Sequence, residues 1–211
     1  MKTISIMAQK GGAGKTTLSL HLAVLADQLG FRSALVDLDP QRSAAMWWEV
    51  REIETPMLIE AAAAQLDEIV ASAKTSDVKM VFIDTPPHAT YEAEIACRVA
   101  DFVLIPCRPA VLDLQAIGKT LELVRETGAK AGLVLNHCPP SRTIIGEAAI
   151  VKEARQGLKA YDIPICPTAV TERVAFSHAL IDGRAVTEYE PDGKASKEIH
   201  SVLTWLCEAM L

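Results

Sequence analysis

The sequence predicts a single α/β domain over residues 1–211, in which a mostly parallel, twisted sheet is covered by helices on both faces. Short apolar runs alternate with helical segments along the chain, which is the pattern of a parallel sheet with helical connections. Half of the 211 residues are hydrophobic, enough for a substantial core. No internal repeat, low-complexity tract or interdomain linker interrupts this alternation.

The expected strands are short apolar runs that end at proline or at polar residues. The clearest is 79–84, where four apolar residues lead to Asp84 and the following Pro86-Pro87 prevents continuation. Residues 33–39 begin with an apolar run too short for a helix and end at a proline turn, so they predict another buried strand. The full set of expected strands is 3–8, 33–39, 57–60, 79–84, 102–107, 132–136 and 163–167.

The expected helices fill the intervals between these strands. Glycine just after a helical segment is a common C-terminal cap, so Gly30 and Gly128 mark the ends of two of them. The segment 41–54 carries Trp47 and Trp48, which cannot both face the core from one helix. Either one ring is exposed as a partner contact or a lid over a site, or both are partly buried at a helix end. The full set of expected helices is 15–29, 41–54, 65–74, 91–99, 113–127, 145–161 and 194–210.

Composition excludes several classes of protein. The first apolar run is short and ends at Gln9-Lys10, unlike a secretory signal, and no run of eighteen apolar residues predicts a membrane span. The five cysteines form no C-x-x-C pair and suit a reducing, cytoplasmic environment. A net charge of −6 argues against a general nucleic-acid binder, so any DNA contact would need a local basic patch.

A glycine-rich loop joins the first expected strand to the first expected helix. Residues 9–17 read Gln-Lys-Gly-Gly-Ala-Gly-Lys-Thr-Thr, and Gly-Lys-Thr at a strand–loop–helix junction is typical of a phosphate-binding loop. Small residues let backbone N–H groups converge on phosphate oxygens, and the helix N-terminus adds partial positive charge. We expect Lys15 to reach the terminal phosphates and the Thr16 hydroxyl to bind Mg²⁺.

The loop departs from the usual spacing G-x-x-x-x-G-K-[ST], because Gln9 occupies the position of the first glycine. It also carries a second lysine, Lys10, beside the glycine pair. A surplus cation in a loop that already contains Lys15 suggests that another negatively charged group approaches it.

Three aspartates follow expected strands, at the sheet edge where ligands bind in open α/β folds. Asp84 stands where an acidic residue would hold Mg²⁺ opposite Thr16, directly or through water. Asp37 and Asp39 are two residues apart, so on a continuous strand their side chains would point in opposite directions. We therefore expect these two carboxylates to have different roles.

Three separate motifs, in this order, resemble those of the ParA-type partition ATPases, part of the deviant Walker A group that also includes MinD. They are Lys10-Gly-Gly-Ala-Gly-Lys-Thr-Thr17, Asp37-Leu-Asp-Pro-Gln41 and Ile83-Asp-Thr-Pro-Pro87. The resemblance continues through Asn136 and the stretch 171–176, and it covers essentially the whole chain. It implies the P-loop NTPase fold, in the short form without a helix-turn-helix before the loop.

The resemblance also implies roles for the motif residues. Lys10 resembles the signature lysine, which reaches across an ATP-bound dimer to the partner's phosphates, while Lys15 acts within its own subunit. Asp39 resembles the residue that orients the attacking water and lies near the metal, and Asp37 a supporting switch residue. The residues implied to bind Mg²⁺ are Thr16, Asp84 and Asp39. Those implied to bind ATP are Lys10, Gly11, Gly12, Ala13, Gly14, Lys15, Thr16 and Thr17, with Asn136 and Pro167 facing the adenine.

The implied activity is that of an ATP-dependent switch with weak ATPase activity. ATP and Mg²⁺ would join two copies of the chain, and the homodimer would bind DNA without regard to sequence. A DNA-binding partner protein that recognises a centromere would stimulate hydrolysis and release the dimer. Such a protein segregates plasmid or chromosomal DNA and is nucleoid-associated in the cytoplasm, with no membrane expected.

A basic face offers one place for DNA. In the expected helix 145–161, Lys152, Arg155 and Lys159 recur at three- and four-residue spacing, and Arg173 follows further along the chain. A solvated helix face balanced by neighbouring glutamates is an equal alternative for the same residues.

The same sequence is compatible with two other functions. A positioning ATPase of the MinD kind, or one for a protein cargo, would share the motifs, and the MinD kind would need a basic amphipathic tail for a bilayer. The C-terminal helix instead carries Ile199, Leu203 and Leu206 on a core-like face. A small-molecule P-loop enzyme resembling dethiobiotin synthetase is the second alternative, but a monomeric site would not obviously require Lys10.

Overall fold

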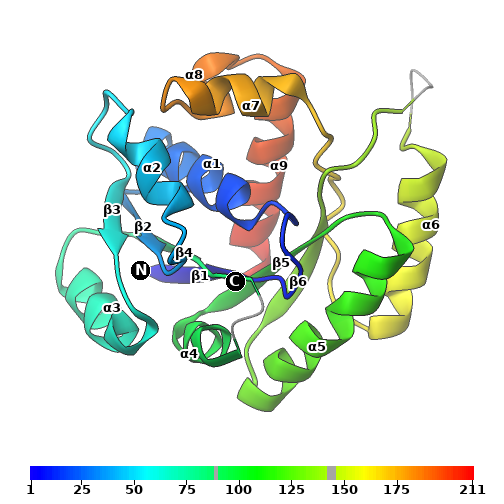
Figure 1. Ribbon diagram of the computed structural model, residues 1–211, viewed down its shortest axis with the longest axis horizontal. Helices are drawn as coiled ribbons and strands as arrows, with labels where there is room; N and C mark the ends of the chain where they lie inside the picture. Colours follow the sequence, from blue (N-terminus) through cyan, green and yellow to red (C-terminus); the bar gives the residue numbers. More distant parts are fainter. Residues whose placement is uncertain (88–89, 142–145) are drawn as a thin grey trace.

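The computed structural model describes residues 1–87, 90–141 and 146–211, and its strands form one six-stranded sheet (Figure 1). The strand order is β3-β2-β4-β1-β5-β6, and every pairing between neighbours is parallel. The predicted parallel sheet is therefore confirmed. The strands are β1 Lys2–Ile6, β2 Ser33–Asp37, β3 Met57–Glu60, β4 Met80–Asp84, β5 Phe102–Cys107 and β6 Ala131–Leu135.

Helices cover both faces of the sheet, as predicted (Figure 1). One face packs against α1, α2, α7, α8 and α9, and the other against α3, α4, α5 and α6. The bounds are α1 Lys15–Gln28, α2 Ser43–Glu49, α3 Leu66–Thr75, α4 Thr90–Val99, α5 Val111–Thr127, α6 Ala149–Leu158, α7 Val174–Ile181, α8 Val186–Tyr189 and α9 Lys194–Ala209, with short 3₁₀ turns η1 Ala63–Gln65 and η2 Lys159–Tyr161.

The register of the sheet aligns the ends of the strands that carry the motifs. Ile6, the last residue of β1, pairs with Asp84 of β4 and with Leu104 of β5. Asp37, the last residue of β2, pairs with the same Asp84. Because all these strands are parallel, the segments that follow them emerge at one edge of the sheet, where a ligand site is expected.

The expected strand 163–167 is wrong. Ile165 makes only an isolated parallel bridge to Leu133 of β6, beyond the edge of the sheet. Pro164 and Pro167 flank this bridge, and proline has no N–H to continue a hydrogen-bonded ladder.

Some helix bounds differ from the expectation. The helix expected over 41–54 is restricted to α2 Ser43–Glu49, and just beyond it the Arg51 side chain donates to the Gly183 carbonyl and to Glu188 of α8. The helix expected over 145–161 begins at Ala149 and ends in η2; its first residue, Ile145, lies outside the described residues. The short helices α7 and α8 were not expected.

The C-terminal helix is confirmed as a core helix. Ile199, Leu203 and Leu206 of α9 are at most 2% exposed, and Met210 accepts a hydrogen bond of 2.8 Å from Lys2 Nζ at the start of β1. Among the residues that the structure describes, no helix combines the length and apolar character needed to span a bilayer.

Candidate nucleotide-binding site

The glycine-rich loop lies at the carboxyl end of the central strand. β1 ends at Ile6, the loop follows, and α1 begins at Lys15. Gly12 and Gly14 have φ angles of +71° and +87°, in the left-handed region that side chains disfavour. The Gly14 carbonyl then accepts the first helical hydrogen bond, from Leu18 N–H at 3.0 Å. The loop thus directs its amides and the N-terminus of α1 toward one point, an arrangement that binds anions.

A cleft of about 460 Å³ opens in front of the loop. Lys15 is 7% exposed, and burial lowers the pKa of its amine while the nearby carboxylates of Asp84 and Asp39 raise it. A buried ammonium surrounded by carboxylates and loop amides suits a polyphosphate with a divalent cation. The cleft is lined by Gly11, Gly12, Gly14, Lys15, Thr16, Thr17, Leu20, Asp39, Ser43, Trp47, Pro87, Arg108, His137 and Leu180.

A second hollow of about 110 Å³ continues from this cleft. The two cavities share Thr17, His137 and Leu180, so a ligand could extend from one into the other. Phe176 and Val170 give the second hollow apolar walls, which suit the ring of a base more than a charged group. Together the two cavities have the dimensions and chemistry of a nucleotide site.

Asn136 fixes the loop from behind. It follows β6, is 4% exposed, and its Nδ2 donates a hydrogen bond of 2.8 Å to the Ala13 carbonyl. A Cβ on Gly14 would lie 2.2 Å from the same Nδ2, so Gly14 is required by close packing as well as by its backbone angle. Asn136 also borders the second hollow, which is compatible with the predicted adenine contact.

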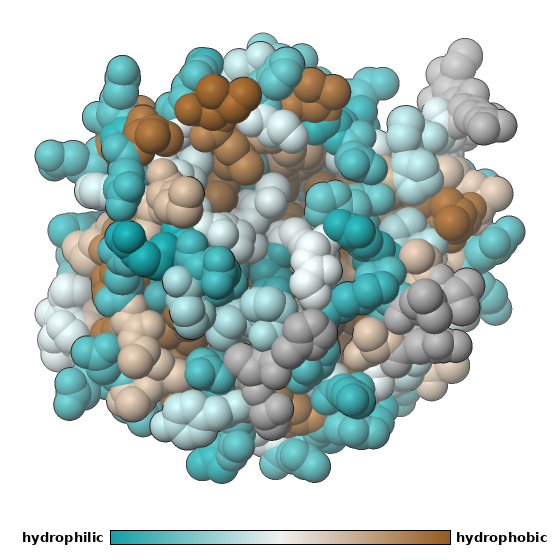
Figure 2. Space-filling view, viewed as in Figure 1, coloured by the Kyte–Doolittle hydropathy of each residue, from teal (hydrophilic) through white to brown (hydrophobic). Residues whose placement is uncertain are grey.

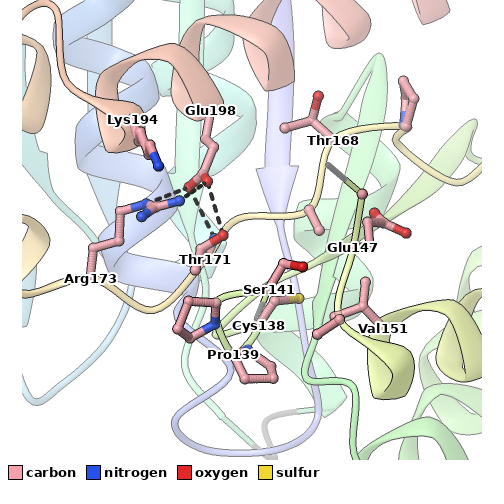
Figure 3. Close-up of a pocket in the computed structure, with 15 residues that line it drawn as sticks. Cys138, Pro139, Ser141, Glu147, Val151, Thr168, Thr171, Arg173, Lys194 and Glu198 are labelled. Atoms are coloured by element: carbon pink, nitrogen blue, oxygen red, sulfur yellow. Dashed lines mark hydrogen bonds and ion pairs between the residues drawn. The ribbon is translucent and has the colours of Figure 1, made fainter. Parts of the chain in front are cut away.

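Pro167 lies in a third hollow, of about 390 Å³, that is distinct from the one bordered by Asn136. Figure 3 shows this hollow, where Arg173 and Thr171 converge on Glu198 of α9. Thr171 and Arg173 line both hollows, so the two hollows lie next to each other. The structure therefore does not bring Pro167 and Asn136 to one common cavity.

Asp84 is placed to hold a cation. It is fully buried; burial raises the pKa of its carboxyl to about 7, and a hydrogen bond from the Thr16 side chain lowers it. The Ser19 hydroxyl donates to Oδ1 at 3.4 Å, whereas Oδ2 has no hydrogen-bond partner among the described residues. An unpaired buried carboxylate oxygen next to a threonine hydroxyl fits Mg²⁺, which prefers oxygen ligands. Thr16 and Asp84 would hold the metal.

Asp37 and Asp39 have different surroundings. Asp37 is 4% exposed, and its two carboxylate oxygens accept hydrogen bonds from Asp39 N–H at 2.9 Å and Ala45 N–H at 3.1 Å. Burial raises the pKa of Asp37, and these amide contacts lower it. Asp39 lines the cleft, and its Oδ1 accepts from Gln41 N–H at 2.9 Å. Asp37 thus shapes the turn that presents Asp39 to the cleft.

Lys10 points away from the phosphate cleft. Its Nζ lies 2.9 Å from Asp113 Oδ2, in the first turn of α5. The Lys10 side chain is 42% exposed, whereas that of Asp113 is 10% exposed. Among the described residues, the lining of the cleft includes Lys15 but not Lys10.

The paired tryptophans are both packed against the core. Trp47 is 6% exposed, lines the cleft, and donates from Nε1 to the Arg184 carbonyl at 3.3 Å. Trp48 is half-buried and donates to the Pro56 carbonyl at 3.0 Å. The structure therefore corresponds to the second alternative, in which neither ring is an exposed lid.

The expected basic face is divided. Lys152 and Lys159 are exposed at α6 and η2. Arg155 instead turns inward, where Nη2 is 2.7 Å from Glu147 Oε1 and its nitrogens also donate to the carbonyls of Cys166 and Pro167. Arg173 pairs with Glu198 at 2.7 Å. Two of the four cations are thus engaged within the domain.

Sequence reasoning missed several side chains of the cleft, among them Arg108, His137 and Leu180. Arg108 follows β5 and His137 follows Asn136 after β6. Both stand at carboxyl ends of parallel strands, a position that could have drawn attention to them. Leu180 belongs to the unexpected helix α7, so the sequence carried no comparable signal.

The fold and this cleft define a P-loop nucleotide-binding domain. Residues 4–186 match the CobQ/CobB/MinD/ParA nucleotide binding domain, so the chain belongs to that family. It is 30% identical over 214 residues to "Maintenance of carboxysome distribution protein A" of Halothiobacillus neapolitanus, covering 95% of this chain and 94% of the relative. It is 29% identical to "Protein ParA" of Rhizobium radiobacter, covering 84% and 81%.

Solved structures agree on the fold. The cell division ATPase MinD of Pyrococcus furiosus superposes with a TM-score of 0.79 at 19% identity, covering 98% of each chain. The Cyanothece McdA–ATP complex gives a TM-score of 0.78 at 19% identity, covering 98% of this chain and 96% of the other. At these identities the likeness establishes the fold of the chain.

Proposed function

We propose that this chain is an ATP-dependent, dimerising switch with weak ATPase activity that partitions or positions a large cargo. The observation that carries this proposal is the placement of Lys10 outside its own phosphate cleft, paired with Asp113. A second cation on the loop that does not face the phosphates of its own subunit is available to those of a partner. Relatives such as the "Chromosome-partitioning ATPase Soj" of Thermus thermophilus support the activity.

Within one subunit, the side chains divide the work on ATP. The loop amides and Lys15 bind the phosphates, and the second hollow takes the adenosine. Bound Mg²⁺, held by Thr16 and Asp84, would neutralise charge on the terminal phosphates. Asp39 orients the attacking water, and Asp37 holds the turn that carries Asp39.

In the homodimer, Lys10 would leave Asp113 and reach the phosphates of the partner's nucleotide. Figure 2 shows exposed apolar side chains over α7 and the segment after α2. Leu180 of α7 and Trp47 of α2 line the cleft, so this surface lies beside it. An apolar surface of this kind favours association with another protein surface. A second copy of the chain is the occupant that Lys10 requires. The exposed apolar residues of this region are Met46, Val50, Ile53, Val174 and Ile181, each between 51% and 71% exposed.

The ATP-bound dimer would bind DNA without sequence preference, mainly through phosphates. The exposed Lys152 and Lys159 are the remaining candidates on the expected basic face, since Arg155 and Arg173 are engaged with glutamates. Such binding would weaken steeply with salt. A centromere-recognising partner protein would stimulate hydrolysis and release the dimer from nucleoid DNA in the cytoplasm.

The cargo has two candidates. ParA- and Soj-named relatives favour plasmid or chromosomal DNA. Two relatives named for carboxysome distribution, each 30% identical, favour a protein assembly instead. The proposed ATP-dependent cycle would serve either cargo. The two possibilities differ in the partner protein that would link the ATPase to its cargo.

Gel filtration of the Asp39→Ala variant with and without MgATP tests the proposal. Loss of the water-orienting carboxylate should trap the ATP state, so we expect a species of twice the 22.8-kDa monomer mass only when MgATP is present. The Asp77→Ala variant, at an exposed aspartate, is the matched control and should behave like the wild type. An Asp39→Ala variant that stays monomeric with MgATP contradicts the dimer mechanism.

Filter retention of DNA tests the DNA surface separately. Lys152→Ala combined with Lys159→Ala should weaken retention while MgATP-dependent dimerisation persists. Lys74→Ala combined with Lys130→Ala removes the same charge from other exposed positions and should change retention little. Equal retention by the two double variants would reject this surface.

A further inference from the structure

Arg108 brings a second cation into the phosphate cleft of its own subunit. It follows β5 Phe102–Cys107 and lines the cleft together with Lys15 and Asp39. Its Nη2 lies 3.1 Å from the position that a Cβ on Gly12 would occupy, so the guanidinium is packed against the glycine loop. The sequence motifs of the loop do not include this residue.

Among the residues that the structure describes, this guanidinium has no anionic partner. None of the ion pairs between described residues involves Arg108, and its Nε is buried without a hydrogen-bond partner in the described part of the chain. Burial lowers the pKa of the neighbouring His137, and the charge of Arg108 lowers it further. A partly buried cation beside a second basic group is unfavourable unless an anion joins them.

The backbone around Arg108 is fixed, so the side chain is presented at a defined point. The carbonyl of Cys107 accepts from Asn136 N–H at 2.8 Å, which ties the end of β5 to the end of β6. The Arg108 carbonyl accepts from the Cys107 thiol at 3.1 Å. Arginine is always charged, and its planar fork matches the oxygens of a phosphate.

We propose that Arg108 binds the phosphates of the nucleotide in its own cleft, as a phosphate-binding cation additional to Lys15. This inference rests on the proposed function, because it presupposes that ATP occupies the cleft. Since Lys10 is directed to Asp113, the phosphate charge within one subunit would be met by Lys15 and Arg108. Arg108 is thus a binding residue outside the sequence motifs of the loop.

A structural role is the competing explanation, since the side chain also covers Gly12. Two substitutions separate the explanations. Arg108→Gln keeps a hydrogen-bonding group of similar width but removes the charge, whereas Arg108→Lys keeps the charge but not the fork. A packing role predicts that both variants lose thermal stability without nucleotide, while a phosphate contact predicts a loss of nucleotide affinity that follows the charge.

Isothermal titration with MgATP and with MgADP, together with nucleotide-free melting temperatures, tests the proposal on the full chain. We expect Arg108→Gln to weaken MgATP binding about tenfold or more, as for loss of a charged hydrogen bond, and Arg108→Lys to be intermediate. Melting temperatures without nucleotide should not fall below the wild-type value. Arg32→Gln, at an exposed arginine just before β2 at the opposite edge of the sheet, is the control and should bind like the wild type.

Two results would overturn the inference while leaving the proposed function intact. One is an MgATP affinity of Arg108→Gln within about twofold of the wild type. The other is a matching loss of melting temperature in both variants, which would assign Arg108 to packing. A wild-type chain that binds no nucleotide would instead refute the proposed function, and this inference with it.

Discussion

Gly14 offers the sharpest test of how the loop is built. A Cβ at this position would lie 2.2 Å from Asn136 Nδ2 and 2.9 Å from His137 Nε2. Both distances are too short for a non-bonded carbon, so the Gly14→Ala variant must displace Asn136. That displacement breaks the 2.8 Å hydrogen bond from Asn136 to the Ala13 carbonyl.

Two contributions set the expected magnitude for Gly14→Ala. A side chain at φ +87° costs about 1–2 kcal/mol, and the lost hydrogen bond costs about 1 kcal/mol. Without nucleotide, the loop of the Gly14→Ala variant can relax. Phosphate binding requires the conformation described above, so both contributions reduce the free energy of MgATP binding. A total of about 2–3 kcal/mol corresponds to MgATP affinity about 30- to 160-fold weaker.

Titration calorimetry measures this effect, and the chain supplies a matched control. Gly30 has a φ of +83°, but nothing lies within 4 Å of the position that its Cβ would take, so Gly30→Ala adds the strain without the clash. Gly30→Ala should leave MgATP affinity unchanged. In an Asn136→Ala background the cost of Gly14→Ala should fall by about 1 kcal/mol, because the hydrogen bond from Asn136 to the Ala13 carbonyl is already absent, whereas the close approach to His137 remains. MgATP affinity of Gly14→Ala within about threefold of the wild type would refute this account of the loop.

Two further predictions concern the elements that support the cleft. Arg51→Ala should lower the free energy of unfolding in urea by about 2–3 kcal/mol, because it removes a nearly buried guanidinium and leaves Glu188, which is only 13% exposed, without the 2.7 Å ion pair. Arg42→Ala, at an exposed ion pair, is the control, and equal effects of the two substitutions would contradict this prediction. Burial lowers the pKa of His21 from 6.5 to about 3, so the unfolded chain binds a proton that the folded chain does not between these values. Below pH 6.5 the free energy of unfolding of the wild type should therefore fall by about 1.4 kcal/mol per pH unit relative to that of His21→Asn. His21→Asn is the control because its side chain can still accept a hydrogen bond from Val186 N–H. Above pH 6.5 the two proteins should show the same pH dependence, and parallel curves over the whole pH range would disprove this prediction.

The sequence was sufficient for the sheet because its strands carry local signals. Apolar runs end at Asp84 and at proline, and Gly128 ends α5 in the left-handed conformation, as its position predicted. The run 163–167 has the same apolar character, yet it forms only a bridge. Its prolines limit the ladder, and whether a short run joins a sheet depends on what lies beside it in space.

The candidate site shows the same division between local and distant information. The loop and Asp84 could be found from spacing because their backbone geometry is local. The pairing of Lys10 with Asp113 joins residues 103 positions apart, and Arg108 reaches Gly12 from another strand. Arg155 likewise turned toward Glu147, although its helical spacing placed it on a basic face. Such contacts depend on tertiary packing, which periodicity does not encode.

Under the proposed function, Lys10 would separate this chain from a small-molecule P-loop enzyme. Membership of the CobQ/CobB/MinD/ParA family and the fold do not by themselves decide between a switch and a biosynthetic enzyme. What distinguishes the proposed switch is that Lys10 acts on the nucleotide of another copy. Lys10→Ala should spare much of ATP binding but abolish productive dimers of the variant with itself, and with them hydrolysis.

The most direct measurement mixes two inactive variants, Lys10→Ala and Asp39→Ala, and follows phosphate release from MgATP. In a mixed dimer, the nucleotide site of the Lys10→Ala chain keeps its own Asp39 and receives Lys10 from the Asp39→Ala chain. Both required side chains are therefore present at that one site. We predict that each variant alone is inactive and that the mixture recovers hydrolysis, as expected for a cation supplied in trans. Full hydrolysis by Lys10→Ala alone, or no recovery on mixing, would contradict the shared site.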